Sequence, residues 1–300
     1  MLPRAWARMM GGRLVIVGVA AALLGCSGPG QPTTTDRASP NRRPMASPTS
    51  RDDQPSGGPR PAASPRPAER RLIAARAHVP VLTYHQVRDW RPSDSPAARQ
   101  LITPPGVFAA QMDALDRAGY VTISGDRLVD HLLTGAPLPP RPLLVTFDDA
   151  SQGQYTDALP VLRRHRFVAT FFVMTVVLDK PHWLSRAQVR RLDQLGMTIA
   201  AHSWDHQPVP RYHSVDWRVQ LVRPAQELGR LVGHRVRLFA YPYGRWVRAA
   251  FPHLQQAGYV AAFQLAGPID PAGPQWTIRR IMVAPTWSRA TLLNRIAHSF

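Results

Sequence analysis

The fold is decided by one stretch of the chain, Leu143-Leu144-Val145-Thr146-Phe147-Asp148-Asp149. A short and nearly all-apolar run is typical of a strand that is buried on both faces of a parallel sheet. Two adjacent carboxylates at the mouth of such a strand repel one another and lose hydration unless a cation lies nearby. A lone Asp-Asp pair is more often a helix cap followed by a surface aspartate. A functional interpretation therefore needs a second observation.

Strands and helices alternate on both sides of this stretch. Predicted strands cover residues 79–84, 120–123, 142–147, 168–174, 197–201, 236–240, 259–263 and 277–283. Predicted helices, with apolar residues at helical spacing, cover 108–115, 126–133, 159–162, 189–195, 219–232 and 292–297. This alternation predicts an α/β fold with one parallel sheet, either a barrel or a doubly wound sheet. In both architectures the chemistry gathers on loops past the carboxyl ends of the strands.

The first 26 residues have the pattern of an export signal. Three arginines precede an apolar run at 14–24, which meets Gly25-Cys26-Ser27. The order around Cys26 resembles a bacterial lipoprotein signal, in which this cysteine is acylated and becomes the mature N-terminus. We therefore expect residues 1–26 to be a lipoprotein signal peptide, with a plain secretory signal as the alternative.

Residues 27–70 have the composition of a disordered linker. They include 10 prolines among 44 residues, with Ser, Thr, Gly and Arg filling most of the rest. Such a segment cannot bury enough apolar surface to repay its ordering entropy. We interpret it as a tether or as a generic disordered leader, and residues 71–300 as the folded domain.

The charge of the chain first suggests a nucleic-acid partner. The formal net charge is +18, and Lys180 is the only lysine among 37 cationic residues. No sequence motif of a nucleic-acid reader accompanies the arginines, so we expect no nucleic-acid partner. The single cysteine excludes an intrachain disulfide and a cysteine-ligated zinc site.

Polar residues also interrupt or follow four other predicted strands. The strand at 197–201 runs into His202-Ser203-Trp204-Asp205-His206, and two histidines four residues apart can face one point if the turn between them is helical. A carboxylate with two imidazoles is a common ligand set for a divalent metal. Two further strands end in His85 and in the Tyr241-Pro242-Tyr243-Gly244 turn, and the pair Arg279-Arg280 lies inside the apolar strand predicted at 277–283. Surface histidines, a strand-ending turn and a structural ion pair are the alternative interpretations.

Taken together, these motifs resemble those of the polysaccharide deacetylases, carbohydrate esterase family 4 with the NodB-homology fold. The resemblance rests on three segments: Thr146-Phe147-Asp148-Asp149, His202-Ser203-Trp204-Asp205-His206, and Phe239-Ala240-Tyr241-Pro242-Tyr243-Gly244. The pattern is most similar to the subgroup that acts on poly-N-acetylglucosamine, in which a strand ending Tyr-His comes first, as Tyr84-His85 does here. The resemblance implies a distorted barrel of about seven βα units, a (β/α)7-type barrel, spanning most of residues 79–300.

The resemblance also implies a role for each matching residue. Asp149, His202 and His206 match the metal ligands. Asp148 matches the catalytic base, His85 the general acid, and Tyr243 the residue whose backbone N–H helps to bind the oxyanion. Arg280 matches an arginine that orients the base, with Arg279 as the alternative, because strand alternation lets only one of the two face the site. The chain departs from the family at Ala150, where most members have glycine, so we expect a differently shaped loop there.

The activity implied is metal-dependent hydrolysis of N-acetyl groups on a polysaccharide that contains N-acetylglucosamine. Zinc is the expected ion, with Co²⁺, Ni²⁺ or Mn²⁺ as alternatives. The expected partners are the acetylated polysaccharide and, through an N-terminal lipid anchor, the outer face of the cell membrane; a secreted protein is the alternative if Cys26 is not acylated. The polymer and the oligomeric state are left open.

Three other classes of protein fit the motifs less well. An iron oxygenase usually takes a histidine and the acid from one short segment, which is not the arrangement in this chain. A glycosidase needs two carboxylates about 5–9 Å apart across the sugar bond, and adjacent aspartates cannot provide this separation. A catalytically inactive, carbohydrate-binding relative would lose the base or the acid, and this chain has both Asp148 and His85.

Overall fold

The central sheet is parallel and follows the order β10-β1-β5-β6-β7-β8-β9, with β4 paired to the first residues of β5. The computed structural model describes residues 65–300. Its strands in this sheet are β1 Val81–Tyr84, β4 Val121–Thr122, β5 Pro142–Asp148, β6 Ala169–Val173, β7 Thr198–Ala201, β8 Leu238–Ala240, β9 Ala261–Phe263 and β10 Ile281–Met282. A second, two-stranded sheet joins β2 Gln86–Val87 to β3 Ile102–Thr103.

The two edges of the main sheet meet in one segment of the chain. Residue Ile278 forms a parallel bridge to Phe263 of β9, and three residues later Ile281 pairs with Leu82 of β1. The N–H of Arg280 also donates to the carbonyl of Leu265 beyond β9, at 3.3 Å. The sheet therefore curls until its edges are joined, which confirms the predicted distorted barrel and excludes the doubly wound alternative.

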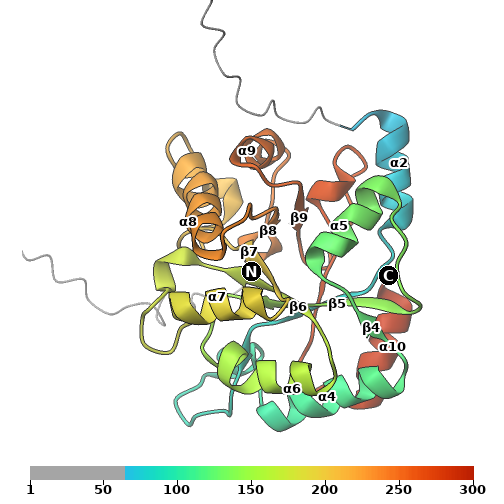
Figure 1. Ribbon diagram of the computed structural model, residues 1–300, viewed down its shortest axis with the longest axis vertical. Helices are drawn as coiled ribbons and strands as arrows, with labels where there is room; N and C mark the ends of the chain where they lie inside the picture. The colour runs from blue at the N-terminus through green and yellow to red at the C-terminus, as the bar shows by residue number, and fades with distance from the viewer. Residues whose placement is uncertain (1–64) are drawn as a thin grey trace, which may run out of the picture. The chain divides into compact units, whose positions relative to one another are not determined.

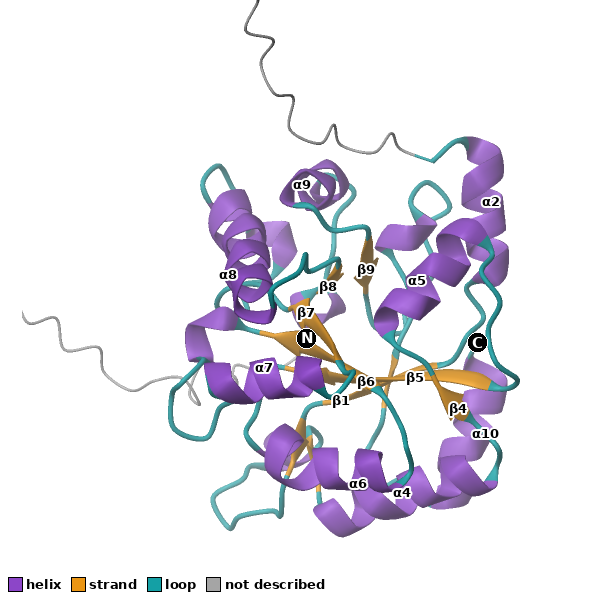
Figure 2. Ribbon diagram, in the orientation of Figure 1, coloured by secondary structure: helices purple, strands orange, loops and turns teal. Residues whose placement is uncertain are grey.

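Helices lie on both faces of the curled sheet. They are α2 Pro67–Arg76, α3 Pro96–Arg99, α4 Pro105–Arg117, α5 Gly125–Thr134, α6 Leu159–Arg164, α7 Arg186–Gln194, α8 Arg223–Val232, α9 Ala250–Ala257 and α10 Arg289–Ser299. Two π-helical turns, η1 Gln154–Ala158 and η4 Arg218–Val222, run directly into α6 and α8. Figure 1 shows α4, α6, α7, α8 and α9 around the outside of the curve formed by β5 to β9, with α5 on its inner side. Figure 2 shows the same layers by type of structure.

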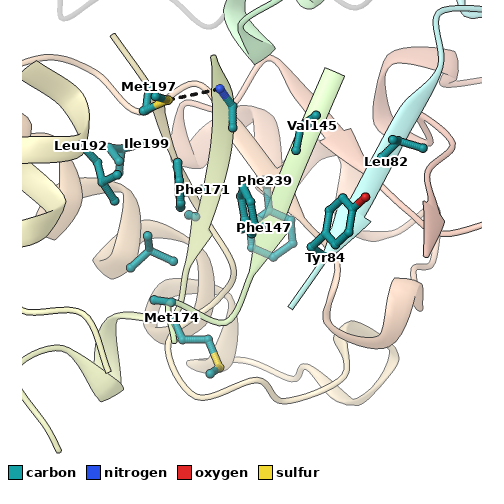
Figure 3. Packing of buried hydrophobic residues seen from close by; sticks show 14 of the residues in the cluster. Leu82, Tyr84, Val145, Phe147, Phe171, Met174, Leu192, Met197, Ile199 and Phe239 are labelled. Carbon is teal, nitrogen blue, oxygen red and sulfur yellow. Dashed lines mark hydrogen bonds between the residues drawn. The ribbon is translucent and has the colours of Figure 1, made fainter. Parts of the chain in front are cut away.

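Alternation along the strands divides the apolar core in two. Val145 and Phe147 of β5 belong to the larger cluster, between the sheet and the outer helices, whereas Leu144 belongs to a smaller cluster on the inner face. In the larger cluster the rings of Phe147 and Phe171 stack with 4.9 Å between their centres. Figure 3 shows both residues among the buried side chains of this cluster. The inner cluster is closed by α5, where the N–H of Gly125 donates to Thr170 Oγ1 at 3.0 Å. A Cβ at Gly125 would lie 2.6 Å from Leu238, so only glycine allows this contact.

The expected strands and helices are present, with two notable differences. The predicted strand at 277–283 is regular only over Ile281–Met282, because residues 278 to 280 bond to the end of β9 before the chain joins β1. Helices α2 and α9 were not predicted, and α2 begins at Pro67, four residues before the expected domain boundary. The expected signal peptide and nearly all of the expected linker lie outside the described residues. Within residues 65–300, no helix has the length and apolar character needed to cross a membrane.

Candidate active site

The polar residues at the strand ends converge because they follow the inner face of the sheet. His85 lies two residues after Thr83, and Asp148 two residues after Thr146, in strands whose threonine hydroxyls contact each other at 3.0 Å. His202 likewise lies two residues after Ala200, which is on the inner face. Side chains two apart on a strand point the same way. The parallel strands therefore deliver these three side chains to one mouth of the barrel.

Asp149, His202 and His206 form a compact cluster at this mouth. The Nε2 atoms of the two histidines are 3.2 Å apart, and each lies 3.5 Å from Asp149 Oδ1. All three side chains are buried. Atoms that share a tetrahedral zinc ion at about 2.0–2.1 Å lie roughly 3.3–3.4 Å from one another. The triangle has the size that a single tetrahedral metal ion requires.

The chemistry of the three atoms also fits a cation. His202 Nδ1 lies 2.8 Å from the carbonyl oxygen of Ala240, and since a carbonyl only accepts, Nδ1 carries the proton. Burial lowers the pKa of His202, so its ring is neutral and its Nε2 presents a lone pair to the cluster. Asp149 Oδ1 is buried and has no hydrogen-bond partner among the described residues. A divalent metal ion would stabilise lone pairs that are concentrated in this way.

Beside the cluster, Asp148 is held by a buried arginine. Arg280 is fully buried, and its two terminal nitrogens donate to Asp148 Oδ1 at 2.7 Å and Oδ2 at 2.9 Å. Burial alone would raise the pKa of Asp148, but the charge of Arg280 and its hydrogen bonds to the carboxylate outweigh burial and hold the pKa below its usual value. Asp148 is therefore an ionised carboxylate in a fixed orientation, with Oδ2 3.9 Å from His202 Nε2.

Only one of the two candidate arginines faces this site. The alternative, Arg279, lies over the ring of Phe300 with its guanidinium carbon 5.9 Å from the ring centre. Arg280 is fixed further by its Nε, which donates to the carbonyl of Gln264 at 3.0 Å. Arg280 therefore turns inward in the segment that joins the end of β9 to β10.

His85 lies near Asp148 at the same mouth of the barrel. Burial lowers the pKa of its imidazole to about 4, while the charge of Asp148 acts in the opposite direction. The buried side chain of Gln154 ties the two residues together, because its Nε2 donates to the carbonyl of His85 at 2.8 Å and to that of Asp148 at 2.6 Å.

Tyr243 occupies a strained turn at the end of β8. Its backbone has φ 59° and ψ 12°, a left-handed conformation that is costly for a residue with a side chain. The turn is closed by the N–H of Gly244, which donates to the carbonyl of Tyr241 at 2.8 Å. The Tyr243 ring meets His206 edge-on, with 4.4 Å between ring centres. Tyr243 thus borders the metal-ligand cluster, as expected from the sequence.

Two local expectations need correction or refinement. The turn between His202 and His206 is not helical: Ser203 and His206 have φ values of 65° and 68°, and a bend brings the two rings together. After Asp149, Ala150 has φ 70°, a conformation that glycine favours. The bend was not foreseen because neither left-handed residue in it is a glycine.

Some supporting residues were not foreseen at all. Gln154 and Gln220 lie on π-helical turns, and Gln264 follows β9; all three are buried. A glutamine in a helical segment normally indicates a solvent-facing side. The only sequence signal for Gln154 is the glycine directly before it. Gly153 packs so closely against the backbone that a Cβ on this residue would lie 1.9 Å from the carbonyl oxygen of Val87.

The fold and the site together define an α/β barrel with a buried Asp-His-His cluster beside an ionised aspartate. Residues 135–262 match the sequence model of the polysaccharide deacetylase family. The chain therefore carries a polysaccharide deacetylase domain, and the resemblance stated from its motifs is confirmed.

Individual relatives agree with this assignment. YxkH of Bacillus subtilis, which is named for the family, is 23% identical over 217 residues, 71% of this chain and 74% of its own length. The poly-beta-1,6-N-acetyl-D-glucosamine N-deacetylase of Escherichia coli K12 is 22% identical over 68% of this chain, which spans only 36% of that enzyme.

Solved structures share the fold. The Streptococcus pyogenes deacetylase PplD, solved with acetate, superposes with a TM-score of 0.68 at 22% identity, covering 73% of this chain and 97% of its own. IcaB from Ammonifex degensii gives a TM-score of 0.61 at 25% identity over 73% of this chain and 96% of its own.

Proposed function

We propose that the chain is a metal-dependent hydrolase that removes N-acetyl groups from an N-acetylglucosamine-containing polysaccharide and releases acetate. The observation that carries this proposal is the juxtaposition of two halves of a site. Three lone-pair atoms 3.2–3.5 Å apart lie next to a carboxylate that Arg280 holds ionised. Metal-assisted amide hydrolysis uses a metal site together with a base beside it.

Asp149, His202 and His206 would hold the divalent ion, with zinc expected and Co²⁺, Ni²⁺ or Mn²⁺ as alternatives. When bound, the ion would lower the pKa of a water towards about 7 and polarise the acetyl carbonyl. The proton transfers and the binding of the oxyanion would depend on residues of the chain.

Asp148 is placed to accept the proton of the attacking water. It lies beside the metal ligands without belonging to their triangle, and its carboxylate is ionised at neutral pH because Arg280 lowers its pKa. The paired hydrogen bonds from Arg280 fix the direction in which its remaining lone pairs point. A proton acceptor fixed in this way typically contributes about 10²–10⁴ to the rate.

His85 is proposed to protonate the departing nitrogen, and the backbone N–H of Tyr243 to donate to the oxyanion. Because the pKa of His85 is about 4, the free imidazole is neutral at pH 7. Negative charge that develops on the reacting carbonyl would raise this pKa, as the charge of Asp148 already does. The proton that Asp148 accepts from the attacking water would thus pass to His85, and from His85 to the departing nitrogen.

The substrate class and location rest on the relatives and the sequence. Relatives are named for peptidoglycan N-acetylglucosamine, chitooligosaccharide and poly-beta-1,6-N-acetyl-D-glucosamine deacetylation. We propose an envelope or extracellular polymer of this kind, reached from a lipid anchor at Cys26. A net charge of +18 would favour residence among anionic lipids and acidic envelope polymers.

The direct test is acetate release from peptidoglycan, poly-N-acetylglucosamine and chitin oligomers, measured side by side with added Zn²⁺ or Co²⁺. We expect release from at least one polymer, and a loss of about a hundredfold or more in kcat for Asp148→Asn with its metal retained. The exposed Asp89→Asn is the matched control. Full activity of Asp148→Asn would refute the assigned base. Binding of a polymer without any acetate release would favour the inactive carbohydrate-binding alternative.

A further inference from the structure

The bend that carries His206 is held by a residue from another part of the chain. Ser203 and His206 both have left-handed backbone conformations, each of which costs roughly 1–2 kcal/mol for a residue other than glycine. Such conformations persist only where the surrounding structure over-determines them. The bend between the two histidine ligands therefore needs specific contacts to hold it.

Gln220 supplies most of these contacts. It is 2% exposed and lies on the π-helical turn η4, which precedes α8. Its Oε1 accepts from the backbone N–H groups of Trp204 at 3.1 Å and Asp205 at 3.4 Å. Its Nε2 donates to Asp205 Oδ1 at 2.8 Å and, more weakly, to Gln207 Oε1 at 3.4 Å.

The orientation of this amide is fixed by its partners. Backbone N–H groups only donate, so the atom that faces Trp204 and Asp205 must be the oxygen. A carboxylate only accepts, so the atom that faces Asp205 Oδ1 must be the NH₂ group. A single amide thus satisfies two of the three backbone donors between the two histidines and also holds the side chain of Asp205.

Two further hydrogen bonds lie within the bend. Asp205 Oδ1 also accepts from the N–H of Gln207 at 3.2 Å, directly after His206. The N–H of His206 donates to Ser203 Oγ at 3.0 Å. Because Gln220 fixes residues 204 and 205 and, through Asp205, residue 207, it fixes His206 from both sides.

We propose that Gln220 is a positioning residue for the metal site, which acts by holding His206 against His202 and Asp149. This proposal rests on the proposed metal-dependent function. Without Gln220, the bend would relax to backbone conformations of lower energy. Metal binding would then have to restore the strained backbone conformation. Partners that orient metal ligands from outside the coordination sphere typically contribute about 10–100-fold in affinity.

The test measures Zn²⁺ affinity of the metal-stripped full chain by competition with a chromophoric chelator. Gln220→Leu, which keeps the volume and removes all four hydrogen bonds, should weaken binding about 10–100-fold. The Co²⁺-loaded variant should also show an altered visible absorption band, because this band reports on ligand geometry. Gln275→Leu is the matched control: Gln275 is also buried but lies on η6 Pro274–Trp276, with no contact to the 202–207 bend. It should keep the wild-type affinity and band.

A second variant keeps the proposal testable if Gln220→Leu does not fold. Gln220→Glu retains the acceptor for Trp204 and Asp205 but places a carboxylate oxygen against Asp205, so it should bind Zn²⁺ more weakly than the wild type. Affinity within twofold of the wild type in either folded variant would overturn the role of Gln220. Failure of the wild type itself to bind Zn²⁺ would instead overturn the proposed metal site.

Discussion

At the scale of single residues, the buried Asp148–Arg280 pair is the most consequential interaction in the site. Both side chains lie almost completely out of water, and two parallel hydrogen bonds join them. A buried ion pair adds little stability as a pair, but removing one partner leaves a charge that nothing compensates. The pair thus couples the proposed base to the stability of the barrel.

We predict that Arg280→Met lowers the free energy of unfolding by about 3–5 kcal/mol. Adding Asp148→Asn to this variant should recover part of the loss, because the buried carboxylate is then neutral. Denaturant unfolding of the metal-stripped variants measures both effects. Arg279→Met is the control and should change stability by no more than about 1 kcal/mol, since Arg279 only lies over an aromatic ring. Equal losses for Arg279→Met and Arg280→Met would contradict the buried pair.

At the scale of elements, the loop after β5 has a residue in a conformation that does not suit it. Ala150 has φ 70° and is completely buried, and its carbonyl accepts from the N–H of Leu184 at 2.9 Å. The left-handed conformation costs roughly 1–2 kcal/mol for alanine and little for glycine. The loop beside Asp149 therefore stores strain.

Ala150→Gly should accordingly be less costly to stability than the same change elsewhere. The matched control is Ala158→Gly, at an equally buried alanine whose φ is −79°. Both variants lose a methyl group and gain chain entropy in the unfolded state, but only Ala150→Gly relieves strain. Thermal or denaturant unfolding should separate the two by about 1–2 kcal/mol in favour of Ala150→Gly. Equal destabilisation would show that Ala150 is not strained.

The loop between β2 and β3 is held by an ion pair whose strength depends on pH. Arg88 donates to both carboxylate oxygens of Asp94 at 2.9 Å, and the N–H of Arg91 donates to Asp94 Oδ2 at 2.7 Å. Hydrogen bonds from Arg88 lower the pKa of Asp94 from 3.8 to about 2. A carboxyl with a lowered pKa in the folded state stabilises above its unfolded pKa and loses this contribution as the pH falls.

Asp94→Asn should therefore lower the melting temperature most above pH 4. The difference from the wild type should shrink as the pH falls from about 4 to about 2, where Asp94 itself becomes protonated. Asp89→Asn, at an exposed position of the same loop, is the control and should show no such trend. A difference that stays constant across this range would rule out the ion pair as its cause.

The elements that sequence patterns predict best are those whose side chains alternate regularly. Apolar strands that end in Asp148, His85 or His202 indicated the mouth of a barrel, because a strand fixes the direction of every second side chain. The same rule left Arg279 and Arg280 undecided, since the direction depends on how residues 278–283 join β9 to β1. Gln154 and Gln220 could not be predicted, because their partners are backbone groups 6 to 69 residues away along the chain.

At the scale of the whole molecule, the site exists only when the barrel is closed. His85 and Arg280 come from opposite ends of the described chain and meet Asp148 because β10 pairs with β1, and β1 with β5. The metal ligands come from the ends of β5 and β7, with β6 between them. An ion that binds only the folded chain stabilises it, by about 2.7 kcal/mol at a hundred times its Kd. Metal binding, folding and activity should therefore rise together.

The most direct measurement is acetate release from an N-acetylglucosamine polymer as metal-stripped protein is titrated with Zn²⁺. We predict that the stripped protein releases no acetate, that release grows in proportion to occupancy up to one ion per chain, and that His202→Ala neither binds the ion nor releases acetate. Undiminished acetate release by the stripped protein in the presence of chelator, or full metal occupancy in His202→Ala, would contradict catalysis through the Asp149-His202-His206 site.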